Sequence, residues 1–506
     1  MYATGLRSAL ITGTPVALRI VSMLTYSLAN RGDESLYVYL YHCLRRDIEE
    51  GVIAAGQRLP SKRAFAEHLG VSVITVEGAY AQLQAEGYIQ AVPRRGYYAS
   101  AVMAAPPAAH TSRLSVSLTA SAPVPPPIAD LTGSGGGSGV FPYALWAKVV
   151  RAVLTCESED ALMREAHAAG SPRLRQAVAS YLRGSRGMEV DPACIVVGAG
   201  AQVLYNAIVQ LLGRRDHRYA VENPGYPRLT SIYGVNDVDL VHIPLGEQGI
   251  AMDSLAASGA SVVHIMPSHQ YPTGLVTSVG RRYELLAWAS GAPERYIVED
   301  DYDCEFRLAG RPIPSLQSID ACGRVIYTNT FAKSLGAAFR LGYMVLPPAL
   351  AEVCTRKLGF YSCTVSVIEQ LTLARFIEEG HYERHVAKAR MRYRQTRDAL
   401  IAALRGSAFS HRLAIEGADG GLHFLMGLSA AEGSEAPLPS EAVLCERARE
   451  RGVLLAPLSS FAVPAAPVGA GPFDPERRWF VVGYGTLDPA AIPQLVAVLE
   501  SVIAQP

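Results

Sequence analysis

Near the N-terminus, hydrophobic and polar positions follow first the period of helices and then that of short strands. Residues 36–53 (LYVYLYHCLRRDIEEGVI) and 62–70 (KRAFAEHLG) carry apolar side chains at helical spacing. Ser61 is placed to cap the second helix and Gly70 to end it. A third helix is expected over ITVEGAYAQLQAEG, and two strands over YIQAVPRRGYYAS. This order is that of a winged helix-turn-helix, a fold whose third helix enters the major groove of DNA.

The remainder of the chain alternates short β-branched runs with helical runs. CIVVGAG precedes the helical run AQVLYNAIVQLL, while VVHIMPSH, YIVEDDYD and RVIYTN are strand-like runs that end in polar residues. This alternation predicts an α/β domain with a mostly parallel sheet. Because ligands in such sheets bind beyond the carboxyl ends of the strands, the polar residues that follow these runs are the candidate site.

Composition separates the two parts. Residues 101–128 are rich in Ala, Pro and Ser, so they cannot bury a core and are expected to form a linker. We therefore expect an N-terminal extension over residues 1–34, a winged helix over 35–100, the linker over 101–128 and the α/β domain over 129–506. A chain of 506 residues is too long for one hydrophobic core, which agrees with this division.

The charge balance and the cysteine spacing indicate which partners and which cellular compartment to expect. Residues 35–100 hold seven Lys/Arg and six Asp/Glu, so one winged helix should bind DNA weakly, and a homodimer with two copies is expected. The eight cysteines include no C-x-x-C pair, which argues against a zinc ribbon and favours a reducing compartment. We expect a cytoplasmic protein without a membrane span or a metal site.

Four features of the α/β part together indicate an aldehyde cofactor. The segment 200–202 follows a strand and opens a helix, where backbone N–H groups and the helix dipole favour a phosphate. Asp300 and Asp301 end an apolar strand, where a buried acid can pair with a protonated ring nitrogen; a solvated acidic loop or a metal site is the alternative. Lys333 follows another strand among small residues, which favours the lowered pKa that Schiff-base chemistry needs, and Arg340 could bind a phosphate. Each feature alone has an ordinary structural explanation, but the set describes a pyridoxal 5'-phosphate site.

The N-terminal run GQRLPSKRAFAEHLGVSVITVEGAYAQLQAEGYI resembles the GntR-type winged helix. Val73 stands where that family usually has an arginine, and Glu77 stands where some members have another basic residue. The alternative is a degenerate winged helix that mediates protein contacts. The resemblance implies DNA contacts from these residues: Ser61, Arg63, Ser72, Thr75, Arg94, Arg95 and Gly96.

The runs PSHQYPTG, VEDDYDCEFR, ENPGY and TFAKSL resemble the fold-type I aminotransferase domain of MocR-type regulators, which follows a GntR-type winged helix. The resemblance implies that Lys333 holds pyridoxal 5'-phosphate as an aldimine, with Asp300 on the ring nitrogen. It implies an effector, an amino compound or the cofactor itself, near Arg228, His269 and Gln270. The remaining implied cofactor-binding residues are Tyr226, Tyr302, Gly200, Ala201, Gln202, Thr330 and Arg340.

Two positions depart from this pattern. Tyr271 precedes Pro272, where aminotransferases have an asparagine. Val481 stands where many relatives have an arginine that binds a carboxylate, and Arg478 would start on the opposite face of that strand. The sequence thus favours a cofactor-dependent transcription regulator acting on promoter DNA, with a head-to-tail homodimer implied by the resemblance. An active aminotransferase with a vestigial winged helix, and a regulator that has lost the cofactor, are the alternatives.

Overall fold

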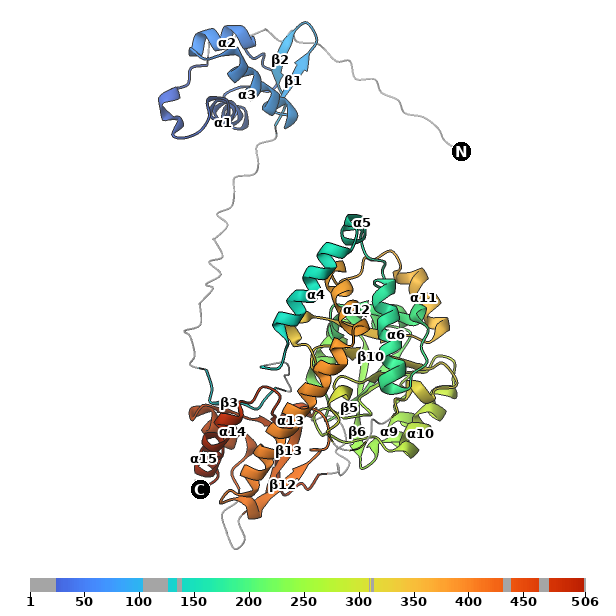
Figure 1. Ribbon diagram of the computed structural model, residues 1–506. Coiled ribbons are helices and arrows are strands. Elements are labelled where there is room, and N and C mark those ends of the chain that lie inside the picture. Colours follow the sequence, from blue (N-terminus) through green and yellow to red (C-terminus); the bar gives the residue numbers. More distant parts are fainter. Residues whose placement is uncertain are drawn as a thin grey trace, which may run out of the picture. The chain divides into compact units, whose positions relative to one another are not determined.

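A computed structural model describes residues 24–102, 126–133, 139–308, 310, 314–430, 438–463 and 473–504. The chain forms two compact units, residues 1–122 and 123–506, each with its own core (Figure 1). Most of the expected linker lies outside the described residues. The two units are therefore described separately.

The first unit is a winged helix-turn-helix. Helices α1 (Leu36–Glu49), α2 (Lys62–Leu69) and α3 (Val73–Ala85) precede an antiparallel hairpin of β1 (Ile89–Val92) and β2 (Gly96–Ala99). The helices form where the apolar spacing predicts them, because each buries one face in a shared core. That core contains Leu40, Leu44, Phe65, Val76, Tyr80, Leu83 and Ile89.

Part of the segment that we assigned to an N-terminal extension packs against this core. The 3-10 helix η1 (Leu28–Arg31) precedes α1, and Leu24 and Tyr26 contact the core residues. The Tyr26 hydroxyl donates a hydrogen bond of 2.5 Å to Asp47 of α1. Residues 24–31 therefore belong structurally with the winged helix.

The second unit is built on an eight-stranded sheet, and its central strands are parallel. Strand β11 is antiparallel to both its neighbours, so β4 runs in the same direction as β10. The mostly parallel sheet expected from the sequence is confirmed. The strand order is β4 (Ile195–Gly198), β11 (Gly342–Val345), β10 (Val325–Thr330), β9 (Tyr296–Asp300), β8 (Val262–Ile265), β5 (Arg218–Asn223), β6 (Asp239–Gly246) and β7 (Gly249–Ile250).

Helices cover both faces of this sheet, because its strands are apolar on both sides. One face packs on α7 (Ala201–Leu212), α8 (Pro227–Val235) and α11 (Pro348–Leu358). The other face packs on α6 (Pro172–Arg186), α12 (Val367–Glu378), α9 (Met252–Ala257) and α10 (Val279–Ser290). Helices α4 (Tyr143–Cys156) and α5 (Glu159–Met163) precede them in the chain.

A smaller antiparallel sheet forms the C-terminal part of the unit (Figure 1). Its strands are β12 (Leu413–Glu416), β13 (His423–Leu428), β16 (Arg478–Gly483) and β15 (Ala456–Pro457). Helices α13 (His381–Arg405), α14 (Glu441–Glu450) and α15 (Ile492–Ile503) contribute to the same core as β13 and β16. The short strand β3 (Ala129–Asp130) pairs with β14 (Val453–Leu454) and so joins the start of the unit to this part.

Candidate functional site

The strand register brings the predicted site residues to one edge of the large sheet. Gly198 at the end of β4 lies opposite Gly342, which lies opposite Thr330 at the end of β10. Thr328 of β10 lies in turn opposite Asp300, the last residue of β9. The segments that follow β4, β9 and β10 therefore meet at the carboxyl ends of these strands, where ligands bind in such sheets.

A cavity of about 470 Å³ opens at this edge. His269 and Gln270 are not among its lining residues, whereas Tyr205, Tyr271 and Phe461 line it without having been predicted. The aromatic residues give part of the cavity an apolar wall. The predicted residues that line it are Gly200, Ala201, Gln202, Tyr226, Arg228, Asp300, Tyr302, Thr330, Lys333 and Arg340.

Lys333 lies in a turn shortly after β10, among buried residues. Its Nζ is 5.8 Å from the ring centroid of Tyr302. Burial lowers the pKa of Lys333 to about 8, although the nearby carboxylates of Asp303 and Asp300 favour the protonated amine. An appreciable fraction of this amine is therefore neutral, and so nucleophilic, near neutral pH.

The two adjacent aspartates after the strand face different surroundings. Asp300 accepts a hydrogen bond from the Tyr205 hydroxyl, and the Nε2 of His264 is 3.8 Å from its carboxylate. Tyr205 lies one turn into α7, and burial raises the pKa of its phenol well above the usual value, so it remains a donor. Asp301 instead accepts from Arg186 and from the Tyr327 hydroxyl. Only Asp300 therefore points toward the cavity.

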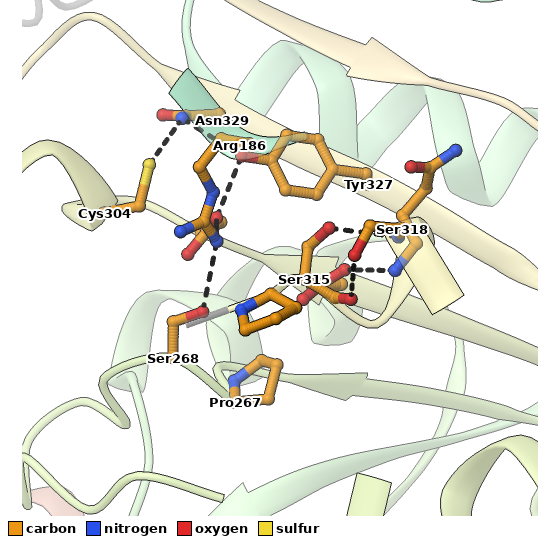
Figure 2. A network of polar contacts seen from close by, with 12 residues as sticks. Arg186, Pro267, Ser268, Cys304, Ser315, Ser318, Tyr327 and Asn329 are labelled. Atoms are coloured by element: carbon orange, nitrogen blue, oxygen red, sulfur yellow. Dashed lines mark hydrogen bonds and ion pairs between the residues drawn. The ribbon is translucent and has the colours of Figure 1, made fainter. Parts of the chain in front are cut away.

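The Asp301 side of the strand carries a buried polar network (Figure 2). Arg186, at the end of α6, approaches Ser268 at 3.5 Å and pairs with the Asp301 carboxylate. The Asn329 amide lies 3.3 Å from the Tyr327 hydroxyl and 3.3 Å from the Cys304 sulfur. These contacts tie α6, β10 and the loops after β8 and β9 together, and so they fix the positions of the strand ends.

The start of α7 and Arg340 form an anion-binding arrangement. Gly200 caps α7 with a φ of +84°, and a Cβ at this residue would lie 2.9 Å from the Arg340 guanidinium. Arg340, itself at a φ of +52°, donates a hydrogen bond of 3.1 Å to the Ala199 carbonyl. The guanidinium therefore lies against the N-terminal end of a helix, where backbone N–H groups and the helix dipole attract anions.

His269 reaches the cavity only through Tyr302. Its Nδ1 lies 3.1 Å from the Tyr302 hydroxyl and 2.9 Å from the Asp303 carboxylate. Burial raises the pKa of the Tyr302 phenol well above the usual value, so this hydroxyl keeps its proton. Gly421 packs so close that a Cβ there would lie 2.2 Å from the His269 ring. The imidazole is thus held in one orientation behind Tyr302.

A second histidine, His423 at the start of β13, lies beside His269 with ring centroids 4.7 Å apart. Burial lowers the pKa of His423 well below the usual value, and its Nε2 lies 3.1 Å from the Pro272 carbonyl. One side-chain atom from each of His269, Asp303 and His423 lies within 4.8 Å of the other two. We interpret this group as a hydrogen-bonded cluster, because the short contacts to Asp303 and Pro272 already orient both rings.

Gln270 and Tyr271 have different positions in the same loop. The Gln270 amide is engaged by its own neighbours, donating to the Pro224 and Tyr271 carbonyls and accepting from Thr273. Tyr271 lines the cavity, and its ring packs at 5.7 Å from Tyr226 and 5.5 Å from Phe461. At the position of the aminotransferase asparagine the protein therefore has an aromatic wall.

In the first unit, the residues predicted to contact DNA lie on α2, α3 and the wing. Ser61 and Ser72 cap α2 and α3, since their side chains accept from the backbone N–H groups of Ala64 and Thr75. The turn of the wing needs a left-handed conformation at Arg94 (φ +62°) and at Gly96 (φ +108°). The three charged side chains of the predicted set are exposed: Arg63, Arg94 and Arg95.

Comparison with known proteins identifies both units. The family described as bacterial regulatory proteins of the gntR family matches residues 36–98, and aminotransferase class I and II matches residues 137–496. The probable rhizopine catabolism regulatory protein MocR of Rhizobium meliloti is 31% identical over 93% of this chain and 94% of its own. The uncharacterized HTH-type transcriptional regulator YhdI of Bacillus subtilis is 34% identical over 92% and 95%. This chain belongs to the MocR-type branch of the GntR family.

Solved structures support the fold of the second unit of this MocR-type regulator. An archaeal alanine:glyoxylate aminotransferase superposes with a TM-score of 0.63 at 22% identity, covering 74% of this chain and 90% of its own. A multiple substrate aminotransferase from Thermococcus profundus gives a TM-score of 0.63 at 25% identity, covering 75% and 92%. Among the described residues, no helix is long and apolar enough to span a membrane.

The MocR-type chain departs from the arginine-bearing pattern at Val481 of β16. This side chain is buried in an apolar cluster with Leu425, Trp479 and Phe461, while the alternate residues Phe480 and Val482 lie in the main C-terminal core. Side chains alternate along a strand, so Arg478 starts on the face of Phe480 and not on that of Val481. Among the described residues, the cationic side chains that line the cavity are those of Arg228, Lys333 and Arg340.

Proposed function

We propose that this chain is a transcription regulator whose second unit binds pyridoxal 5'-phosphate through Lys333 and senses an amino compound or the cofactor itself. One observation carries the proposal: a partly buried lysine with a lowered pKa shares a cavity with Asp300 and with the anion-binding start of α7. The winged helix supplies DNA binding, and the cofactor-binding unit supplies the response.

The residues of the cavity fit the cofactor group by group. The start of α7 with Arg340 suits a phosphate, because a side chain on Gly200 would fill the space beside the guanidinium. Asp300 is buried and already oriented by Tyr205, so its carboxylate can hold a proton on a ring nitrogen. Lys333 provides an amine that loses its proton readily. When bound, pyridoxal phosphate supplies an aldehyde on an electron-withdrawing ring.

The remaining residues would position the cofactor ring and admit the effector. Tyr226 and Tyr271 contribute aromatic faces, and Tyr302 keeps a protonated hydroxyl that His269 and Asp303 hold in place. Arg228 lies in the first turn of α8, where its exposed side chain lines the cavity and can attract an anionic group of an effector. Gln270 would act indirectly, by fixing the loop that carries Tyr271.

Regulation requires that the ligand bind two arrangements of the protein with different affinity. We propose that occupancy of the cavity changes the presentation of the winged helices in a homodimer. Two copies are needed because the winged helix has a margin of one positive charge, which gives a single copy few phosphate contacts. Promoter DNA is therefore the proposed partner.

An aminotransferase activity is the second candidate, because Lys333, Asp300 and the anion site are all present. The apolar wall at Val481 argues against efficient turnover, since no arginine of β16 reaches the cavity to orient a substrate carboxylate. Regulation is therefore the better supported function.

The proposal is tested on the full chain with Lys333→Ala, and with Lys388→Ala on the exposed face of α13 as the matched control. After incubation with pyridoxal phosphate and removal of excess, the wild type and Lys388→Ala should retain a visible absorption band that Lys333→Ala lacks. Binding to the chain's own upstream DNA is then measured with the cofactor, alone and with a panel of amines. Absence of the band in the wild type would refute cofactor binding, and multiple turnovers with an amino donor and a keto acid would favour the enzyme.

A further inference from the structure

The first turn of the recognition helix α3 exposes two apolar side chains. Val73 and Ile74 directly follow the capping residue Ser72 and retain 41% and 78% of their accessible surface. The next apolar residue, Val76, is fully buried in the winged-helix core, so the orientation of this turn is fixed. Val73 and Ile74 therefore project away from the unit at the position where a winged helix meets the base edges.

The polar groups of the same turn are engaged with each other. The Ser72 hydroxyl accepts from the Thr75 backbone N–H at 3.1 Å and lies 2.8 Å from the Thr75 hydroxyl. Glu77, one turn after Val73, pairs with Lys62 of α2 at 2.7 Å. Residues 73–76 include no Arg, Lys, Asn or Gln, the side chains that make paired hydrogen bonds to guanine or adenine. What this turn presents to a base edge is chiefly apolar.

The major groove has one apolar recognition group, the C5 methyl of thymine. We propose that Val73 and Ile74 read thymine methyl groups, so that the operator half-site of this protein carries thymine where the first turn of α3 lies. The inference rests on DNA binding by the winged helix, which is part of the proposed function. It also explains Val73: an arginine there would select guanine, whereas valine removes that preference and adds a contact for a methyl group.

Comparing thymine with uracil tests the proposal, because these bases differ only by the C5 methyl. The cofactor-loaded full chain first selects its preferred site from randomised duplex DNA. Each thymine of the selected half-site is then replaced by uracil, and affinity is measured for the wild type, Ile74→Ala and Val52→Ala. Val52 is an apolar control outside α3, 61% exposed in the turn after α1, and all variants are checked by thermal unfolding.

We expect uracil at one or more positions of each half-site to weaken wild-type binding about fourfold, the effect of losing one buried methyl-sized group. Ile74→Ala should lose the fourfold difference at the thymine that Ile74 contacts and keep any difference due to Val73, while Val52→Ala should keep the difference at every position. Val73→Arg should shift the selected base toward guanine. Specific binding with equal affinity for both duplexes would refute this inference alone. No sequence-specific binding by any form would refute the DNA-binding part of the proposed function as well.

Discussion

The cavity of the second unit and the recognition surface of the first differ in how their functional groups are held. In the cavity, Asp300 is buried and Lys333 is partly buried, and each has neighbours from other strands and helices. On the winged helix, Arg63, Arg95 and Ile74 are exposed and separate from one another along the chain. Burial amplifies each electrostatic contact, whereas exposure to water and salt weakens it. Single substitutions should therefore have large effects in the cavity and graded effects on the DNA-binding surface.

The largest effect is expected from the buried amine, measured on cofactor-free protein. Burial lowers the pKa of Lys333 from 10.5 to about 8, so between these pH values the unfolded chain binds more protons than the folded one. The free energy of unfolding therefore rises between pH 8 and pH 10.5. Below about pH 8 the burial of the charged amine destabilises the folded protein by its full amount. At about 1.4 kcal/mol per pKa unit, Lys333→Met should be about 3 kcal/mol more stable than the wild type at pH 7.

Denaturant unfolding of the second unit at pH 7, 8.5 and 10 measures this difference. The advantage of Lys333→Met should shrink toward zero as the pH approaches 10.5, and Lys388→Met on the surface of α13 should show no such trend. A constant difference between wild type and Lys333→Met at all three pH values would contradict a buried, titrating amine.

The next effect is expected at the ring-nitrogen position. Asp300→Asn keeps the shape of the side chain but removes its charge, so affinity for pyridoxal phosphate should fall about 30-fold, the worth of a charge-assisted hydrogen bond. Asp301→Asn is the matched control, because this adjacent carboxylate pairs with Arg186 on the other side of the strand. It should reduce stability and leave cofactor affinity nearly unchanged. Fluorescence titration with the cofactor measures both, and equal losses of affinity would show that the two carboxylates are not distinguished.

That pair also shows what the sequence could and could not predict. The positions of Lys333, Asp300 and Gly200 after strands were enough to bring them together, because parallel strands share one carboxyl edge. Which aspartate faces the cavity depends on strand register, which the pattern of residues did not give. Tyr205 was missed because it lies within an ordinary apolar helix, although its place one turn after Gly200 was a usable signal.

Contacts between residues distant in the chain could not be predicted from the sequence, for a different reason. His423 and Phe461 come to the loop of His269 and Tyr271 only through the packing of the C-terminal sheet. No local pattern carries that information, since contacts between residues so far apart in the sequence depend on tertiary packing. On the winged helix, by contrast, the sequence predicted the elements closely, because each is set by local spacing and by caps such as Ser61 and Gly70.

A smaller effect is expected from the wing. Arg95 is exposed on the turn between β1 and β2, so its contribution to DNA binding should be a phosphate contact without sequence preference. Arg95→Ala should weaken binding to selected and unrelated duplexes alike, roughly threefold to fivefold at moderate salt, and reduce the salt dependence of binding by about one unit of slope per site. Arg214→Ala, an exposed arginine of the second unit, is the control. A loss confined to the selected duplex would indicate base readout by Arg95 instead.

The smallest effect is expected at the ion pair between Glu77 and Lys62 of the winged helix. The Glu77 carboxylate pairs with Lys62 at 2.7 Å, and both side chains are partly exposed, so the pair should contribute little to stability. Glu77→Gln should leave the melting temperature nearly unchanged and strengthen binding to unrelated DNA about twofold, with a steeper salt dependence, because Lys62 becomes available to phosphate. Glu67→Gln on α2, an exposed acid that forms no ion pair with the residues that the structure describes, controls for the change in net charge alone. If both variants gain equally, the gain comes from the overall field of the domain, and Glu77 has no special effect on Lys62. If only Glu77→Gln gains, then even on the exposed surface a single ion pair sets part of the affinity for DNA.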